Sequence, residues 1–368
     1  MGMSRALVVI ASALAIVGLL FFVIVMSFNG WRFDLVFSEG IDERIVDLDG
    51  GIQNITVNVS ATDVTVLPST DGAGRVVIRE HRNIHHKAAQ SGGELTIGYE
   101  DERSWIDHLF NFIDMSITVY LPAGEYAELK IDASTADIEI REGFVFSNIA
   151  IKVGTGDVLV RSSALGAVTL EASTGDVQAR NIECASLSAT TGTGDISVSG
   201  VSAAGDASLN AASGTVALTA STGDVRARNT ACASLSVTTS TGDIEIEGAS
   251  VAGAISTSVS TGKTELSDVA CAEYVARGGS GDIELERVVA SGKLDIQVRT
   301  GDVELEDSDA ADIYITTTTG DVEGSLLSEK VFITSTSTGE VDVPNTVAGG
   351  RCEITTSTGD IEISVKGK

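Results

Sequence analysis

The chain has 368 residues, with 24 Lys and Arg against 52 Asp and Glu, and therefore a net charge of −28. Such a charge repels phosphate backbones, which excludes nucleic acid as an expected partner. With 43% hydrophobic residues the chain can still bury a large core. Its 39 Gly, only 3 Pro and 5% aromatic residues favour many short strands and tight turns over helices.

Residues 1–30 contain a short N-terminal tail and a predicted transmembrane signal-anchor helix. No charge occurs from Ala6 to Met26, and at about 1.5 Å per residue a helix of this length crosses a hydrocarbon core of about 30 Å. A cleavable signal peptide has a shorter apolar region and a small-x-small cleavage site, which this segment lacks. Arg5 precedes the helix, which favours a single-pass protein of the cell membrane with an extracytoplasmic body. A cytoplasmic body stays open as the alternative.

Residues 31–133 differ from the rest of the chain and are expected to form a β-rich cap. They contain alternating apolar and polar runs such as Ile55–Val59 and Ser116–Tyr120. A solenoid needs an atypical end that covers its first coil. Within this region, Ser104–Ile113 has apolar residues at helical spacing and should pack in the cap, with a partner-binding or membrane-surface patch as the alternative.

Residues 134–368 repeat one signature, Thr-Gly-Asp followed by Val or Ile. Its glycines are 19 or 20 residues apart, except for one nine-residue step: Gly156, Gly175, Gly194, Gly214, Gly223, Gly242, Gly262, Gly281, Gly301, Gly320, Gly339 and Gly359. A fixed period of this length is typical of solenoid proteins.

The residues around each glycine alternate between apolar and polar. Positions seven and five before the glycine and two after it are mostly aliphatic, as in Leu235, Val237 and Ile244. A period of two places these residues on one face of a strand, so each repeat should form two short strands that meet at a Gly-Asp corner. The sequence therefore predicts an all-β parallel β-helix, or solenoid, of about 12 stacked coils. The chirality of strand crossovers favours a right-handed coil.

The nine-residue step from Gly214 to Gly223 interrupts this rhythm. If Gly214 is a corner, Thr215 takes the place of the aspartate and Val216 the place of the aliphatic residue that follows. Ala203–Thr222 should then form a half-coil or a local hairpin, to which no function is assigned.

Nine of the predicted corners carry an aspartate directly after the glycine: Asp157, Asp176, Asp195, Asp224, Asp243, Asp282, Asp302, Asp321 and Asp360. Glycine can take a positive φ and aspartate can accept from a nearby backbone N–H, so turn chemistry alone explains the pair. Stacked carboxylates about 4.8 Å apart repel one another and must be solvated, hydrogen-bonded or neutralised. The alternative is therefore a cation-binding column with weak Ca²⁺ affinity.

The cysteines and histidines show no pattern of a metal site. Three cysteines lie ten residues before a glycine and no two of them in adjacent coils, too far apart for a disulfide, and the fourth lies in an apolar column, so we predict four buried thiols: Cys184, Cys232, Cys271 and Cys352. The histidines all fall within residues 31–133 without acidic or cysteine partners at ligand spacing, which favours a solvated loop: His81, His85, His86 and His108.

Signals of catalysis are missing. The repeats contain no histidine that could act as a base, and there is no nucleophile elbow or phosphate loop. Coils of uniform length also leave no long loops to hold a substrate. We therefore predict no catalytic or cofactor-binding residues, and the less favoured alternative is a polysaccharide-active β-helix enzyme.

The last coil, Asp360–Val365, ends the chain without an obvious cap. Only Lys366 and Lys368 would guard its strand edge. Homo-association through this C-terminal edge, giving a self-assembling structural element, is therefore an alternative function.

The repeated Thr-Gly-Asp-Ile/Val-x-Ile/Leu run, preceded by Tyr120–Gly124 and Leu129–Ile138, resembles the putative-adhesin family of β-strand-repeat domains (DUF4097-like). The resemblance extends from about Ile52 to the C-terminus. It implies a repeat domain of bacterial or archaeal envelope proteins, often behind one membrane anchor, and supplies no catalytic residues. We therefore expect a membrane-anchored, extracytoplasmic, adhesin-like binding or scaffold module with an envelope or surface ligand, and envelope-stress sensing is the alternative.

Overall fold

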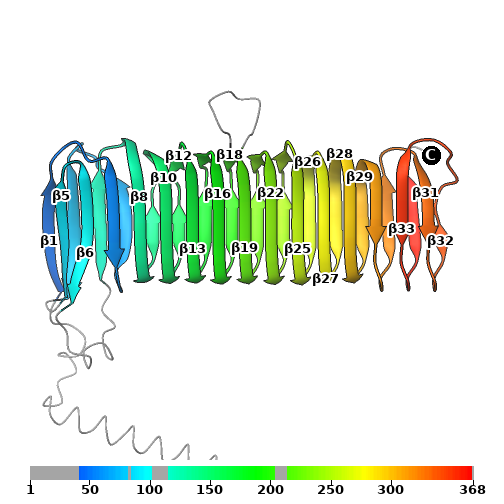
Figure 1. The fold of residues 1–368 in the computed structure, drawn as a ribbon, viewed down its shortest axis with the longest axis horizontal. Helices are drawn as coiled ribbons and strands as arrows, with labels where there is room; N and C mark the ends of the chain where they lie inside the picture. The colour runs from blue at the N-terminus through cyan, green and yellow to red at the C-terminus, as the bar shows by residue number, and fades with distance from the viewer. Residues whose placement is uncertain (1–40, 82–83, 102–114, 204–213, 367–368) are drawn as a thin grey trace, which may run out of the picture.

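The computed structural model describes residues 41–81, 84–101, 115–203 and 214–366, which form a long rod of stacked β-coils (Figure 1). The N-terminal strands lie at one end of the rod and the C-terminal strands at the other. The predicted Ala6–Met26 helix and the Ser104–Ile113 segment fall outside the described residues. Within those four described ranges, no helix is long and apolar enough to cross a membrane.

The architecture is the predicted all-β solenoid, whose coils pair in parallel. One side is the long sheet, whose spatial order is β5 (Ile84–Ser91), β6 (Glu94–Asp101), β2 (Asn54–Val59), β8 (Gly124–Thr135), β10 (Phe144–Thr155), β13 (Ala167–Thr174), β16 (Ser186–Thr193), β19 (Thr215–Thr222), β22 (Ser234–Thr241), β25 (Ala254–Thr261), β27 (Glu273–Ser280), the second halves of β28 (Ile283–Thr300) and β29 (Val303–Thr316), β33 (Gly350–Thr355) and β31 (Lys330–Ser335). The expected right-handed sense stays a prediction.

A second side follows the Gly-Asp corners and is called the corner sheet. Its order is β1 (Ile41–Leu48), β4 (Gly74–His81), β7 (Ser116–Leu121), β3 (Asp63–Pro68), β9 (Ile138–Ile140), β11 (Val158–Val160), β14 (Val177–Arg180), β17 (Ile196–Ser199), β20 (Val225–Arg228), β23 (Ile244–Glu247), the first halves of β26 (Thr264–Cys271), β28 and β29, then β30 (Val322–Leu326), β34 (Ile361–Val365) and β32 (Val341–Asp342).

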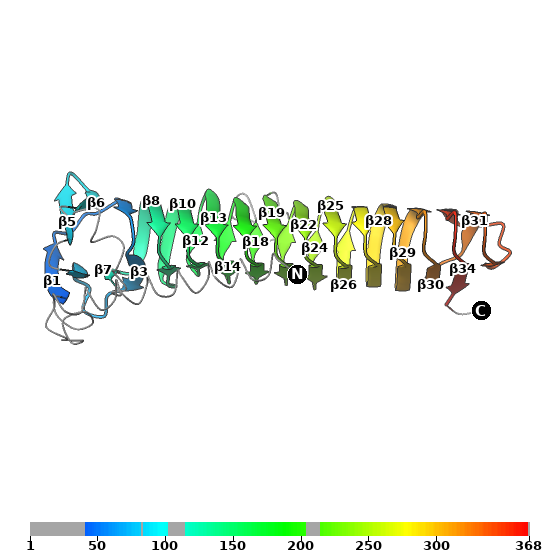
Figure 2. The ribbon, with the colours of Figure 1, turned by 90° about the horizontal axis from the view of Figure 1, so that it is seen from below.

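A narrow third side closes each coil. It consists of two-residue strands, visible between the two larger sheets in Figure 2: β12 (Ser163–Ala164), β15 (Glu183–Cys184), β18 (Ser202–Ala203), β21 (Ala231–Cys232) and β24 (Ser250–Val251). The start of β10 and the end of β26 continue this row.

Alternation along each strand builds the core, as the sequence pattern predicts. Leu235, Val237 and Ile244 are all within 1% of complete burial, and Ser236 and Thr238, next to them in β22, face outward. Some column positions depart from the aliphatic rule and still lie in the core, among them Thr257 and Tyr274. Their hydroxyl groups are 3.0 Å apart and share a hydrogen bond. This contact satisfies two buried polar groups that would otherwise cost stability.

The interpretation of Gly214 as a corner is wrong. Val216 pairs with Leu187 and Thr222 pairs with Thr193, so Val216 occupies the position seven before a glycine, not two after one. The coil that ends at Gly223 is therefore one full coil in which Thr215–Thr222 is a strand of the long sheet, and it is not a half-coil. Residues 204–213 of this coil lie outside the described residues.

The N-terminal end of the rod is closed by antiparallel pairing. β1 pairs with β4 and β4 with β7, while β5 pairs with β6, all antiparallel. The coil made of β2 and β3 lies one coil further in, because β2 lies between β6 and β8, and β3 between β7 and β9. The strands β2 and β3 thus form an inner coil, and the strands that follow them in the chain, β4 to β7, cover it at the end of the rod.

The C-terminal end shows the reverse insertion, and it corrects the location predicted for the open edge. β33 lies between β29 and β31, and β34 lies between β30 and β32. In Figure 1 the red C-terminal strands accordingly lie inside the orange end of the rod. The edge predicted at Asp360–Val365 is therefore covered on both sides, and β31 and β32 form the edge instead.

Side-chain contacts tie the inserted coil into place. The backbone N–H of Arg351 donates to the carboxylate of Asp312 at 3.0 Å, and the Lys366 ammonium contacts Asp307 at 2.5 Å. Across the inserted strand, the Lys330 ammonium lies 2.6 Å from Asp309, with the lysine only 3% exposed. Lys366, which the sequence suggests as a guard of the strand edge, thus makes a specific ion pair with a preceding coil, and Lys368 lies outside the described residues.

Candidate functional site

The predicted aspartates line one column along the corner sheet, here called the aspartate ladder, which is interrupted at Lys263. Each carboxylate Oδ1 accepts the backbone N–H of the corresponding residue in the next coil, at 2.7–2.9 Å, for acceptors Asp63, Asp137, Asp157, Asp176, Asp195, Asp224, Asp243, Asp282, Asp302, Asp321 and Asp360. The structure therefore brings together all nine aspartates predicted from the sequence. It also adds Asp63 and Asp137, which the Thr-Gly-Asp signature does not mark.

The ladder supplies the hydrogen bonds that a stack of carboxylates needs. Arg226 adds partial neutralisation, because its guanidinium lies 3.5 Å from Asp195 and 2.7 Å from Asp224. At Lys263 the column has no carboxylate, but the Lys263 backbone N–H still donates to Asp243 at 2.8 Å. The ladder therefore organises the corners by backbone hydrogen bonding whether or not a cation is bound.

Close approach explains why the corners require glycine. Gly175 has a φ of +131°, and a Cβ placed there would lie 2.1 Å from the carbonyl oxygen of Gly156. No side chain can be accommodated against a backbone atom at that distance.

Threonines three residues before the glycine complete the corners, and they are buried except for Thr336, which is half-buried. Their hydroxyl groups donate to a corner glycine carbonyl of a neighbouring coil at 2.9–3.3 Å, in Thr191, Thr239, Thr317, Thr336 and Thr356. This hydrogen-bonding role of the threonines was not predicted from the sequence. The signal was present as a polar residue at a position that the period of two assigns to the core.

The alternative that the ladder binds cations stays a prediction. Among the residues that the structure describes, no group of three or more His, Cys, Asp or Glu side chains is arranged to hold a metal ion. The second carboxylate oxygens of the ladder could interact with cations from solvent, which would be weak and spread along the column.

All four cysteines are buried and free, which confirms the prediction made for them. Burial raises the pKa of Cys184 to about 11 and that of Cys352 to about 12. A thiol with such a pKa is protonated at neutral pH and is a poor nucleophile.

The expectation of solvated histidines is wrong for His86, which is 2% exposed. Its Nδ1 lies 2.9 Å from the Glu80 carboxylate, its Nε2 lies 3.1 Å from the Thr62 hydroxyl, and Arg44 donates to its backbone carbonyl. Burial is the largest influence on the imidazole and lowers its pKa below 6.5. No periodic pattern marks this cluster, because Glu80 and His86 lie in consecutive strands of different sheets, β4 and β5, and Thr62 reaches His86 from 24 residues away. His85, by contrast, has a side chain that is 57% exposed.

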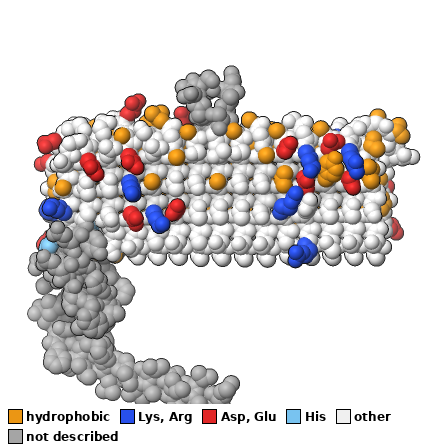
Figure 3. All heavy atoms as spheres, viewed as in Figure 1, with side chains coloured by type: hydrophobic (Ala, Val, Ile, Leu, Met, Phe, Trp, Pro, Cys, Tyr) orange, Lys and Arg blue, Asp and Glu red, His pale blue; other side chains and the backbone are white. Residues whose placement is uncertain are grey.

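Charged side chains are unevenly distributed on the rod. On the long-sheet face in Figure 3, Lys, Arg, Asp and Glu gather toward the two ends, and the stretch between them carries neither sign. Outward positions of the central coils there are hydroxyl residues, such as Thr190, Thr219 and Thr238. Near the C-terminal end, Lys293 lies over the Tyr314 ring at 4.8 Å and Arg351 over the same ring at 5.8 Å.

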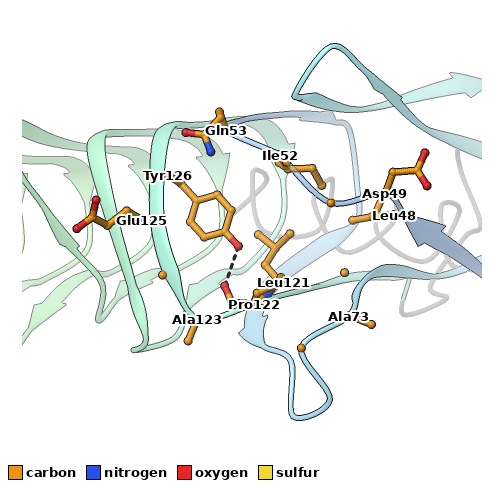
Figure 4. A pocket seen from close by; sticks show the side chains of 15 residues that line it. Leu48, Asp49, Ile52, Gln53, Ala73, Leu121, Pro122, Ala123, Glu125 and Tyr126 are labelled. Atoms are coloured by element: carbon orange, nitrogen blue, oxygen red, sulfur yellow. Dashed lines mark hydrogen bonds between the residues drawn. The ribbon is translucent and has the colours of Figure 1, made fainter.

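A pocket of about 360 Å³ lies between the N-terminal cap and the first coils (Figure 4). Apolar side chains such as Leu48, Ile52 and Leu121 line it, and the Tyr126 hydroxyl donates to the Pro122 carbonyl at 2.7 Å. Its lining contains no His, Cys, Ser, Lys or Arg. The lining therefore contains no two residues that could act as nucleophile and general base. It also contains no positively charged side chain that could hold an anionic ligand.

The C-terminal tip, defined as β31, β32 and residues 343–349, exposes apolar side chains. Val331 is 37% exposed, Ile333 45% and Val341 45%, and Val347 on the connecting segment is 93% exposed. Val341 stands two residues after a corner glycine. The residues at the same position in the other coils are all within 1% of complete burial. The tip thus presents a piece of the solenoid core to the surroundings.

Comparison with solved structures gives distant similarities. A "putative adhesin" of Bacteroides fragilis has 13% identity, covers 89% of this chain and 98% of its own, and gives a TM-score of 0.30. A "putative lipid binding protein" of Parabacteroides distasonis has 16% identity, covers 77% of this chain and 96% of its own, and gives a TM-score of 0.31. A "putative cell adhesion protein" of Clostridium sporogenes has 8% identity, covers 89% of this chain and 100% of its own, and gives a TM-score of 0.22.

No curated protein matches the sequence significantly. A family profile does match, in three segments that together cover most of the chain: residues 52–250, 202–287 and 250–368. The chain belongs to the Toastrack DUF4097 family.

Proposed function

We propose that this protein is a membrane-anchored rod of the cell envelope that presents its C-terminal tip as a non-catalytic, adhesin-like binding or scaffold surface. The observation that carries the proposal is the difference between the two ends of the rod. At the N-terminal end the edge strands β1 and β5 pair antiparallel with their neighbours and β1 carries four charged residues, whereas the C-terminal tip exposes apolar side chains beside its strand edges. Exposed apolar surface of this kind is typical of interaction sites.

The order of the chain supports this arrangement. Only 14 residues separate Met26, the end of the predicted anchor, from Ile41, the first described residue, so the capped end lies near the membrane. Fifteen strands spaced by about 4.8 Å hold the tip about 65–70 Å further along the rod. A stiff spacer of this length suits a molecule that carries a binding surface out of the membrane plane.

A catalytic function is less well supported. The described pocket lacks two residues that could act as nucleophile and general base. The four thiols are buried and protonated. A polysaccharide-active enzyme would need clustered carboxylates and basic residues along a groove. The ladder carboxylates instead accept backbone N–H groups one by one.

Selective labelling of an introduced thiol tests the membrane topology, because the native cysteines are buried. Ser236 is exposed on the long sheet, so Ser236→Cys in the full chain should react with a membrane-impermeant maleimide on intact cells, and the unaltered chain should not. Deletion of residues 6–26 should move the protein out of the membrane fraction. As a control, Leu165→Arg, at a body residue that is 70% exposed, should leave it there. Labelling that requires permeabilised cells would contradict an extracytoplasmic body.

A further inference from the structure

The C-terminal tip ends in two strands with a neighbour on one side only. Among the described strands, β31 pairs with β33 alone and β32 pairs with β34 alone. β31 reads Lys-Val-Phe-Ile-Thr-Ser, a short β-prone segment. Its one charge, Lys330, is withdrawn into the buried pair with Asp309 and does not guard the edge. Such an edge is a ready template for pairing with another strand.

Symmetry restricts how a second copy of this chain could pair there. A two-fold axis perpendicular to the sheet brings two β31 strands together antiparallel and keeps the inner face of each sheet on the same side. Directly opposed residues then point to the same face, so Val331 would face Ile333 of the other copy. The inward Phe332 of each copy would lie at the joined core. The edge is therefore complementary to itself.

The edge strands at the other end of the rod are poor partners for the tip. Among the described strands, β1 pairs with β4 alone and β5 with β6 alone, but β1 carries Asp42, Glu43, Arg44 and Asp47, and β5 carries Lys87 and two histidines. Charged side chains on an edge strand oppose pairing, so head-to-tail stacking into a filament is disfavoured. An interface that uses the same patch on both copies closes after two subunits. Glu340 and Asp342 flank the tip and limit how tight such an interface can be.

We propose that the C-terminal tip binds the tip of a second copy, joining two rods end to end through antiparallel pairing of their β31 strands. This inference deepens the proposed function, because it names the partner of the tip, and its membrane consequence rests on that function. With anchors at the two far ends of the joined rod, the dimer would connect two membrane surfaces that face each other. Association within one membrane would need the rods to lie flat.

Sedimentation of the full chain in detergent tests the dimer. The unaltered chain should show a concentration-dependent monomer–dimer equilibrium. Ile333→Lys places a charge against the apolar Val331 of the other copy and a like charge diagonally across the pairing, and it should raise the dissociation constant at least about tenfold. Leu165→Lys is the control, because Leu165 is also an exposed aliphatic residue, 70% exposed, but lies in a coil far from the tip, and it should change nothing.

Cross-linking gives a second measurement that does not depend on how the lysine variant folds. Ile333→Cys should form dimers with a short bismaleimide, and Ser236→Cys, in the same outward row of a central coil, should not. A chain that is monomeric up to its solubility limit would overturn the proposal. So would a dimer unaffected by Ile333→Lys, which would place the association in the anchor, or equal cross-linking at both positions, which would indicate lateral contact. The topology labelling above is independent of these results, so failure of the anchored-rod function and failure of the tip dimer are distinguishable.

Discussion

The backbone N–H of Asp360 donates to the carboxylate of Asp321 at 2.7 Å, across 39 residues of sequence. The next N–H in the ladder, that of Glu340, donates in turn to Asp360 at 2.7 Å. Spatial order at this end is therefore 321, 360, 340, and the chain's final coil fills the space between the two coils that precede it. This insertion makes β31 and β32 the outer edge, on which the tip proposal depends.

The buried pair that spans the inserted coil should be important for stability. Lys330→Ala would leave the Asp309 carboxylate, 14% exposed, without its ammonium partner, and should cost about 3–5 kcal/mol. The double variant Lys330→Met, Asp309→Leu should recover most of this loss, because it removes both charges. Urea unfolding followed by circular dichroism measures both. Lys152→Ala, which breaks an exposed pair with Glu171, should cost less than about 0.5 kcal/mol.

The ladder should depend on an acceptor oxygen more than on charge. Asp176→Asn keeps an oxygen for the N–H of Asp195 and relieves repulsion within the column, so stability should stay equal or rise. Asp176→Ala removes the acceptor and should cost about 1–3 kcal/mol. Thermal unfolding of the two variants compares them directly. Equal destabilisation by both would show that the negative charge itself is required.

Corner glycines should not tolerate alanine. In Gly242→Ala the new Cβ would lie 2.1 Å from the carbonyl oxygen of Gly223, at a φ of +137°. We expect a loss of roughly 2–4 kcal/mol, measured by urea unfolding. Gly98→Ala serves as the control, because Gly98 has open space for a Cβ and no positive φ, and it should be nearly neutral.

His86 should make the stability of the N-terminal cap depend on pH. Because burial lowers its pKa in the folded state, the unfolded chain binds the proton first as the pH falls. Its contribution is then fully present above about pH 6.5 and is lost as the pH falls toward the folded pKa. Glu80 opposes this lowering of the His86 pKa, whereas the charges of Arg44 and His85 add to it.

The melting temperature measured between pH 7.5 and pH 5 tests this prediction. His86→Gln should flatten the profile in that window, and His85→Gln, at an exposed position, should leave its shape unchanged. A profile that is identical in all three proteins would contradict the assignment.

Cations should stabilise the ladder by screening. Raising NaCl should increase the melting temperature, because the chain carries a charge of −28 and the ladder carboxylates repel one another. Calcium at matched ionic strength should add little, since one oxygen of each ladder carboxylate already accepts an N–H. A calcium effect that is reversed by chelator and far exceeds the matched salt would establish specific sites along the column.

The sequence by itself determined the repeating part of this protein. A period of 19 or 20 with aliphatic residues at alternate positions leaves one solution, because only stacked parallel coils bury such columns continuously. The Gly-Asp corners and the four buried thiols follow from the same alignment. These features depend on residues close in sequence and on a repeat that every coil shares.

Only the tertiary structure decided how the coils are ordered and where the repeat is interrupted. Neighbouring coils are so alike that each could stack on several others, and long-range contacts such as Lys330 with Asp309 select one order. The same reason explains the error at Gly214, where the strand register and not the local motif identifies the corner. His86 became buried through pairing of strands that no periodic pattern connects, and the open end of the rod followed from where the last coil was inserted.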